Sequence, residues 1–255
     1  MNRQVQFQMA PMTPVVKWLL IITVGIWFFL QVLLERFFNV PLTAALSLVP
    51  ERVVENFEIW RLFTYIFLHI SDQPAAVTHI LFNMLMLWFF GGRLEERWGP
   101  KFFGFFYVMS GIGAALVYSF GIVLHAAYTG VQSAKMVPVI GASGSVFGLL
   151  IAYGLIFRNE IIYFMGVFPM RALTFAILAG LIDFASIITS SVRGGGVAYL
   201  AHLGGLASGF LLLRLRRFWV AYSQNEKAKK KYRNLRLVVD NEKKDKNQQG
   251  PRYWN

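Results

Sequence analysis

Apolar residues run along this chain in long stretches separated by short polar segments. A stretch of roughly 20 apolar residues can cross the hydrocarbon core of a bilayer, and a helix buried among others can be shorter. Six stretches fit, and we predict that each is a membrane-spanning helix: Val15–Leu34, Ala75–Gly92, Phe102–Leu124, Gly141–Phe157, Ala172–Thr189 and Ala198–Leu213. The pattern therefore predicts an all-α integral membrane protein, built as a six-transmembrane-helix bundle.

The polar segments divide the chain into three parts. Residues 1–14 form a short N-terminal segment, residues 15–217 form the membrane domain, and residues 218–255 form a basic tail that we expect to be mostly disordered. The long first outer loop, Glu35–Pro74, is net acidic but rich in aromatic residues. We expect this loop to dip into the membrane interface.

Composition and charge exclude several classes of protein. Hydrophobic residues make up 56% of the chain and charged residues only 15%, against about a quarter charged in soluble domains. Soluble enzymes and coiled coils are thus excluded. The segment from Arg214 onward holds 13 of the 25 basic residues but only 4 of the 13 acidic ones. The tail thus supplies +9 of the net charge of +12, so the positive charge describes a segment beside anionic lipid headgroups and does not indicate a nucleic-acid partner.

The distribution of basic residues also predicts an orientation. Basic residues favour the cytoplasmic side of a membrane. Both termini are therefore predicted to be cytoplasmic, which requires an even number of spans and agrees with six. The chain has no cysteine, which excludes disulfides, thiolate nucleophiles and cysteine-ligated metals.

Polar side chains inside the predicted spans are functional candidates, because lipid makes them costly. His79 and Asn83 are four residues apart near the outer start of the second span, and so lie on one helical face. Ser143 opens the fourth span within the sequence Gly-Ala-Ser-Gly, where free N–H groups would stabilise an anion. His202 begins the sixth span, followed on the same face by Gly205 and Gly209.

All three polar groups share one depth, because the second, fourth and sixth spans each run from outside to inside. The small residues of the fourth and sixth spans permit the close approach that a hydrogen bond between Ser143 and His202 requires. His69 and His125 lie near no polar motif and are expected to be ordinary interfacial residues. Asp183 is predicted to be a buried structural hydrogen-bond partner, so no carboxylate is expected to assist the serine and histidine.

These residues match the pattern of a known family. The chain resembles the rhomboid intramembrane serine proteases of the bacterial six-span type over roughly Trp18 to Leu213. The matching motifs are Trp60-Arg61, His79-x-x-x-Asn83, Gly91-Gly92-x-x-Glu95-x-x-x-Gly99, Gly141-x-Ser143-Gly144 and His202-x-x-Gly205-x-x-x-Gly209.

The resemblance implies an intramembrane serine endopeptidase with a Ser-His dyad. Ser143 would be the nucleophile and His202 the general base, and His79 and Asn83 would form the oxyanion hole with the Ser143 N–H. Phe147 stands where the family stacks an aromatic ring, Tyr in some relatives, on the histidine.

The resemblance also suggests supporting roles. Gly141, Gly144, Gly205 and Gly209 would support the site. Trp60 and Arg61 would anchor the outer loop, Arg61 through carbonyls or headgroups, while Glu95, with Arg97, would cap the inner end of the second span; these three motif residues are expected to be structural.

The resemblance further implies a partner and a location. The substrates would be transmembrane proteins cleaved near the outer face of the membrane, and the location would be the bacterial plasma membrane. No cofactor is implied, and the sequence does not disclose the oligomeric state.

Three alternatives stay open at this point. A rhomboid-like pseudoprotease would bind transmembrane helices without cutting them, although such relatives usually lack the serine or histidine. A small transporter or channel could use the polar residues inside the spans to line a path. A metal site formed by His79 and His202 ranks last, because it lacks a nearby carboxylate or third histidine.

Overall fold

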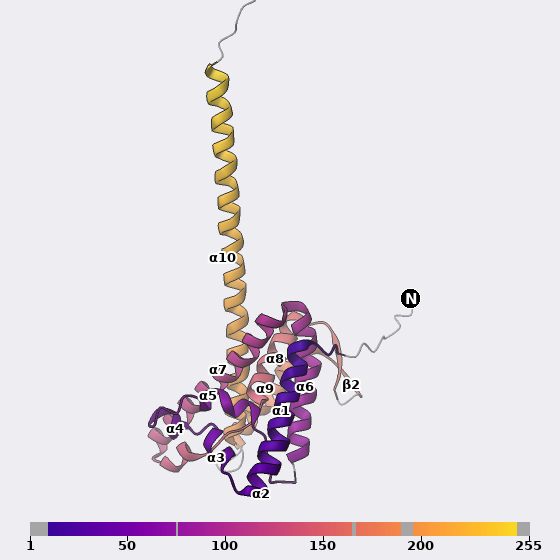
Figure 1. Ribbon diagram of the computed structural model, residues 1–255, viewed down its shortest axis with the longest axis vertical. Coiled ribbons are helices and arrows are strands. Elements are labelled where there is room, and N and C mark those ends of the chain that lie inside the picture. Colours follow the sequence, from indigo (N-terminus) through magenta and orange to yellow (C-terminus); the bar gives the residue numbers. More distant parts are fainter. Residues whose placement is uncertain (1–9, 75, 165–166, 190–195, 249–255) are drawn as a thin grey trace, which may run out of the picture. The chain divides into compact units, whose positions relative to one another are not determined.

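The computed structural model describes residues 10–74, 76–164, 167–189 and 196–248. The chain divides into two compact units, residues 1–212 and residues 213–255. The first unit carries every candidate site residue. Within it, helices are the dominant element (Figure 1).

The first apolar stretch forms one continuous helical segment with a change of geometry in its middle. It consists of α1 (Pro14–Gly25), the π-helical η1 (Ile26–Glu35) and α2 (Arg36–Phe38). Pro14 occupies the first turn of α1, where its missing N–H costs nothing. The wider π turns coincide with a buried polar residue, Gln31, and π-helical turns are frequent at functional sites.

Two long helices follow and are separated by a single glycine. They are α6 (Ala76–Trp98) and α7 (Pro100–Thr129). Gly99 between them has φ +81°, which ends α6, and Pro100 begins α7 with a favourable fixed φ. α1 packs along α6, and the two run side by side (Figure 1).

The centre of the first unit is α8 (Ser143–Ile156), which packs against α6, α7 and α9 (Ala172–Thr189). Most of its residues are buried, including Ser145, Gly148 and Leu149. The last helix, α10, runs from Gly196 to Gln248, and its part up to Leu212 belongs to the first unit.

The predicted first outer loop, Glu35–Pro74, here called the outer segment, is folded rather than extended. It contains the short helices α3 (Leu42–Leu46), α4 (Pro50–Val54), α5 (Arg61–Thr64) and the 3₁₀ turn η2 (Tyr65–Phe67). A second 3₁₀ turn, η3 (Gln132–Met136), follows α7 and packs against it and against α4.

The apolar helices agree with a membrane protein. Among the described residues, three helices are long and apolar enough to cross a membrane: Pro14–Phe38, Ala76–Trp98 and Pro100–Thr129. Ser143–Ile156 and Ala172–Ile188 are shorter apolar helices. The first three predicted spans are thus found as helices of sufficient length, and the total of six stays a prediction.

One segment differs from the all-α expectation. Residues after α8 form a small antiparallel hairpin, β1 (Ile161–Phe164) and β2 (Phe168–Arg171), in which Ile161 pairs with Arg171. β-branched and aromatic residues favour strands there.

The tail was expected to be mostly disordered, but α10 continues as a helix to Gln248. Residues 218–248 contain no Gly or Pro, and their Lys, Glu, Arg and Leu residues favour helix. Residues 1–9 and 249–255 of the predicted terminal segments lie outside the described residues.

Glu95 has a different partner from the one predicted. Instead of capping the end of its own helix, its buried carboxylate accepts hydrogen bonds from the first turn of α1: Thr13 Oγ1 at 2.6 Å and the N–H groups of Val15 and Val16 at 3.0 Å. A carboxylate at a helix N-terminus satisfies free N–H groups and complements the helix dipole. Glu95 therefore joins α6 to α1.

Candidate active site

Ser143 is the first residue of α8, directly after the turn that contains Gly141. Gly141 in that turn has φ +130°, a backbone conformation that residues with a side chain rarely adopt. Ser143 is half-buried, while Gly141, Ala142 and Gly144 around it are buried. The N–H groups of the first helical turn have no partner within the helix, so the start of α8 favours negative charge near Ser143.

The outer segment holds the chain that leads into this turn. Leu48 forms an antiparallel bridge with Val139, with N to O distances of 3.0 and 2.9 Å. The Gly141 N–H donates to the carbonyl oxygen of Tyr65 at 3.0 Å, and the Ala142 N–H donates to His69 Nε2 at 3.4 Å. The approach to Ser143 is therefore fixed by residues more than 70 positions away in the sequence.

His202 lies on α10, which contacts α8 through glycines. A Cβ atom on Gly205 would overlap the carbonyl oxygen of Gly144, and a Cβ atom on Gly209 would lie 2.7 Å from Gly148 Cα. Only a residue without a side chain permits this approach of the two backbones. This packing places the start of α8 beside the part of α10 that carries His202. Among the described residues, the side chains of Ser143 and His202 form no hydrogen bond with each other.

Two neighbours orient the His202 ring. Phe147, one turn after Ser143, stacks on the imidazole with a centroid distance of 4.4 Å and an interplanar angle of 10°. Asp183 on α9 places Oδ2 3.1 Å from His202 Nδ1, and only 6% of Asp183 is exposed. The expectation that no carboxylate lies near the histidine is therefore wrong. The sequence could not reveal this contact, because it depends on how α9 and α10 face each other.

His79 and Asn83 lie on α6 beside the start of α8. A Cβ atom built on Gly141 would lie 3.4 Å from His79 Nε2 and 3.6 Å from Ser143 Oγ, so both groups border the same small space. Asn83 is buried, and its Nδ2 donates to the carbonyl oxygen of His79 at 2.9 Å. One amide hydrogen of Asn83 is thus engaged within α6.

His69 was expected to be an ordinary interfacial residue, yet it is fully buried beneath the turn before Ser143. Its ring centroid lies 5.3 Å from that of His79. Burial, together with the nearby His79, lowers the pKa of His69 to about 3, so the ring is neutral at physiological pH. The sequence carried no periodic signal for this residue, because its burial comes from the folding of the outer segment.

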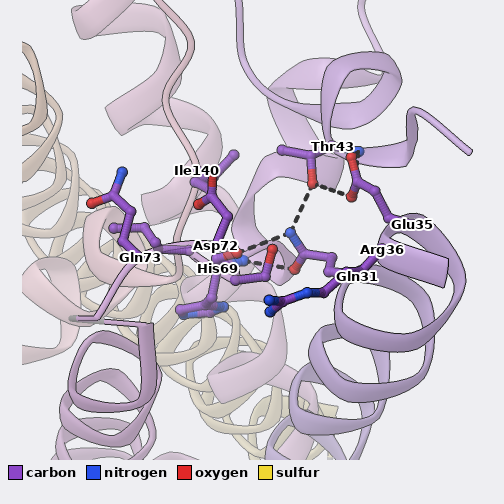
Figure 2. Close-up of a pocket in the computed structure, with 10 residues that line it drawn as sticks. Gln31, Glu35, Arg36, Thr43, His69, Asp72, Gln73 and Ile140 are labelled. Carbon is purple, nitrogen blue, oxygen red and sulfur yellow. Dashed lines mark hydrogen bonds between the residues drawn. The ribbon is translucent and has the colours of Figure 1, made fainter. Parts of the chain in front are cut away.

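Gln31 on η1 holds His69 in place. Its side-chain amide pairs with the backbone of His69: Nε2 donates to the carbonyl oxygen at 2.9 Å, and Oε1 accepts from the N–H at 2.9 Å. Nε2 also donates to Thr43 Oγ1 at 2.9 Å, and the Thr43 hydroxyl donates to Glu35 at 2.7 Å. Figure 2 shows these bonds at the wall of a polar cavity of about 510 Å³, which Ile140 also lines.

The two residues of the Trp60-Arg61 motif have different environments. Trp60 is 50% exposed, whereas the Arg61 guanidinium is buried. Arg61 donates to the carbonyl oxygens of Ala44 at 2.9 Å and Ser47 at 2.7 Å, and it pairs with Glu58. Arg61 thus contacts backbone carbonyl groups and ties α3 to α5.

The arrangement provides the groups that acyl transfer requires. A serine at a helix start lies beside an oriented imidazole and a second histidine that borders the same space. Among the described residues, no group of three or more His, Cys, Asp or Glu side chains is arranged to hold a metal ion.

Comparisons with known proteins agree with the residue pattern. Residues 56–217 match the family described as Rhomboid domain. The chain is similar to "RHOMBOID-like protein 1" of Arabidopsis thaliana, with 40% identity over 161 residues, 63% of this chain and 35% of that protein. It is similar to "Putative rhomboid protease YdcA" of Bacillus subtilis, with 34% identity over 192 residues, 72% of this chain and 82% of that protein.

A shorter match is the "Rhomboid protease GlpG" of Salmonella newport, with 48% identity over 50 residues, 20% of this chain and 16% of that protein. The matched region spans between about a third and about three fifths of the length of the first Arabidopsis relatives. The family match covers well over half of this chain, including the starts of α6 and α8 and the first-unit part of α10. This chain is a membrane protein and belongs to the rhomboid family.

Proposed function

We propose that this protein is an intramembrane serine endopeptidase that hydrolyses peptide bonds of transmembrane proteins near the outer face of the membrane. The observation that carries the proposal is the placement of Ser143 at the start of α8, one turn before the ring of Phe147 that stacks on His202. Relatives from Bacillus and Salmonella bear the name rhomboid protease, which supports the same reaction class.

In this mechanism Ser143 is the nucleophile and His202 the general base. Ser143 Oγ attacks the scissile carbonyl carbon while its proton passes to His202 Nε2. The imidazolium then gives that proton to the leaving amine, which breaks the peptide bond and leaves an acyl-serine. Water attacks the acyl-serine with His202 again as the base, which releases the new carboxyl end and restores Ser143.

The oxyanion of the tetrahedral intermediate would lie in the space bordered by His79 and Ser143. The Ser143 N–H and the side chains of His79 and Asn83 are the proposed donors. Donors aimed at developing charge in a site of low dielectric constant are worth far more than in water. Because Gly141 has no side chain, that space stays open for the carbonyl oxygen.

The other predicted residues support this machinery without touching the substrate. Gly144, Gly205 and Gly209 let α8 and α10 approach, and Phe147 orients the imidazole by stacking. Trp60, Arg61 and Glu95 are structural residues of the outer segment and of the α1 to α6 contact.

The membrane setting of the proposal is as follows. The chain spans the bilayer six times with both termini in the cytoplasm, and the basic tail contacts anionic lipid headgroups. The site needs no cofactor or metal, and the partners are transmembrane proteins and lipid rather than nucleic acid. A bacterial plasma membrane is the proposed location, and relatives from both plants and bacteria belong to the family.

The decisive experiment compares the wild type with Ser143→Ala and His202→Ala. Each purified protein is treated with a serine-reactive fluorophosphonate and, separately, with a model transmembrane substrate. We expect labelling and cleavage by the wild type alone. A folded wild type that does neither would contradict the proposal and favour a pseudoprotease that binds transmembrane helices. Ion or solute flux insensitive to the fluorophosphonate would favour a channel.

A further inference from the structure

Asp183 is a buried acidic residue in an otherwise uncharged helix. α9 contains no other ionisable side chain, and Asp183 is 94% buried within it. A carboxylate at such a position is costly in lipid unless it has a partner, and such residues tend to mark functional sites. Its partner in the structure is His202, with 3.1 Å between Oδ2 and Nδ1.

This contact completes the orientation of the imidazole. The Phe147 stack fixes the plane of the ring, but a ring can still turn within that plane. Asp183 removes this freedom, because it meets the ring at its edge and engages Nδ1. When one ring nitrogen donates to a carboxylate, the tautomer is fixed and the other nitrogen is the acceptor.

We propose that Asp183 is the third member of the catalytic group, a positioning residue that holds His202 with Nδ1 protonated and Nε2 free to accept the Ser143 proton. The inference rests on the proposed protease function. During the reaction the proton moves from Ser143 Oγ to His202 Nε2, while Asp183 stays deprotonated and Nδ1 keeps its hydrogen. The carboxylate also stabilises the positive charge that forms on the ring.

Among the described residues, two other titratable groups lie near His202. Tyr199 on the same helix contacts the ring edge-on at a centroid distance of 6.2 Å, and His79 on α6 is close enough to interact electrostatically with His202. Neither is acidic at neutral pH. Asp183 is therefore the only carboxylate among the described residues that forms an ion pair or hydrogen bond with this imidazole.

The test measures kcat and KM for a model transmembrane substrate in the wild type, Asp183→Asn and Asp183→Glu. Replacing the acid of a Ser-His-Asp site by its amide lowers kcat by roughly 10⁴-fold in other proteases. Because the Phe147 stack still holds the ring here, we expect Asp183→Asn to lower kcat by about 10²-fold or more with KM unchanged. Asp183→Glu keeps the carboxylate and should recover part of the loss.

A matched control separates this role from mere stability. Glu95→Gln also neutralises a buried carboxylate, but one that contacts the first turn of α1. It should lower the unfolding temperature and leave kcat per folded molecule unchanged. The rate of fluorophosphonate labelling of Ser143 should fall in Asp183→Asn by about the same factor as kcat, because the probe reacts at Ser143 without a transmembrane substrate.

The outcomes distinguish the inference from the function on which it rests. If wild-type cleavage is lost in Ser143→Ala while folded Asp183→Asn retains wild-type kcat and labelling, Asp183 is structural and the inference is overturned. If the wild type neither cleaves nor labels, the protease function itself fails. If Asp183→Asn does not fold, Asp183→Ala decides, because it removes the carboxylate and leaves a small apolar side chain: lowered kcat with unchanged KM supports the inference, and wild-type kcat refutes it.

Discussion

Gly141→Ala tests whether the space between His79 and Ser143 receives the carbonyl oxygen of the substrate. The new Cβ would lie 3.4 Å from His79 Cε1 and Nε2 and 3.6 Å from Ser143 Oγ. These are ordinary van der Waals distances, so the methyl group fits without displacing either side chain. It would, however, occupy the place where we propose that the oxyanion forms.

Two effects of different size follow from the geometry. The backbone at φ +130° is strained for any residue with a side chain, which costs about 1–3 kcal/mol of stability. The methyl group also excludes the oxygen from its donors. Because removal of a single oxyanion donor typically costs on the order of 10²–10³-fold in rate, we expect kcat to fall by at least about 10²-fold.

The control for backbone strain is Gly130→Ala. Gly130 ends α7 with φ +75°, and a Cβ atom there would meet no atom within 4 Å. Both variants should lower the unfolding temperature, but only Gly141→Ala should lose kcat on a transmembrane substrate. Wild-type kcat in folded Gly141→Ala, or an equal loss in both variants, would refute the placement of the oxyanion.

Three further predictions concern the parts that support the site. Gln31→Leu leaves the buried backbone N–H and C=O of His69 unpaired, so it should destabilise the protein by about 1–3 kcal/mol per group and lower kcat, measured by thermal unfolding and cleavage. Because the folded pKa of His69 is about 3 and the unfolded value is 6.5, the unfolded chain binds more protons between these values. Stability should therefore fall as pH drops below about 6.5 and continue to fall towards pH 3, and His69→Gln should flatten this dependence in unfolding measurements; an unchanged slope would argue against it. Glu95→Gln should weaken charge-assisted hydrogen bonds to Val15 and Val16, with a loss of about 1–2 kcal/mol in unfolding free energy and no change in kcat.

The helices and the small-residue contacts could be predicted because their signals are local. Apolar stretches determine where a helix lies, and glycines three and seven residues after His202 indicate a face that meets another backbone. The structure places that face against α8, where Gly205 meets Gly144 and Gly209 meets Gly148. Spacing along one helix was sufficient for this part.

The remaining contacts depend on pairs that no spacing reveals. Asp183 and His202 are 19 residues apart on two helices, and their contact depends on the rotation of each about its axis. Glu95 meets a helix start about 80 positions earlier in the chain, and a carboxylate can cap whichever N-terminus packing brings near it. His69 belongs to a segment without regular periodicity, so its burial follows only from the tertiary fold.

The outer segment is therefore part of the active-site framework, although the sequence indicated only an interfacial anchor. The buried Arg61 guanidinium holds the carbonyl oxygen of Ser47, and the next residue, Leu48, pairs with Val139 just before the turn that carries Ser143. Loss of Arg61 would leave the Ser47 carbonyl without a buried charged donor and loosen the bridge between Leu48 and Val139 that positions this turn. Because misplacement by about 1 Å can cost 10²-fold in rate, a residue far from the chemistry can affect kcat through this chain of backbone contacts.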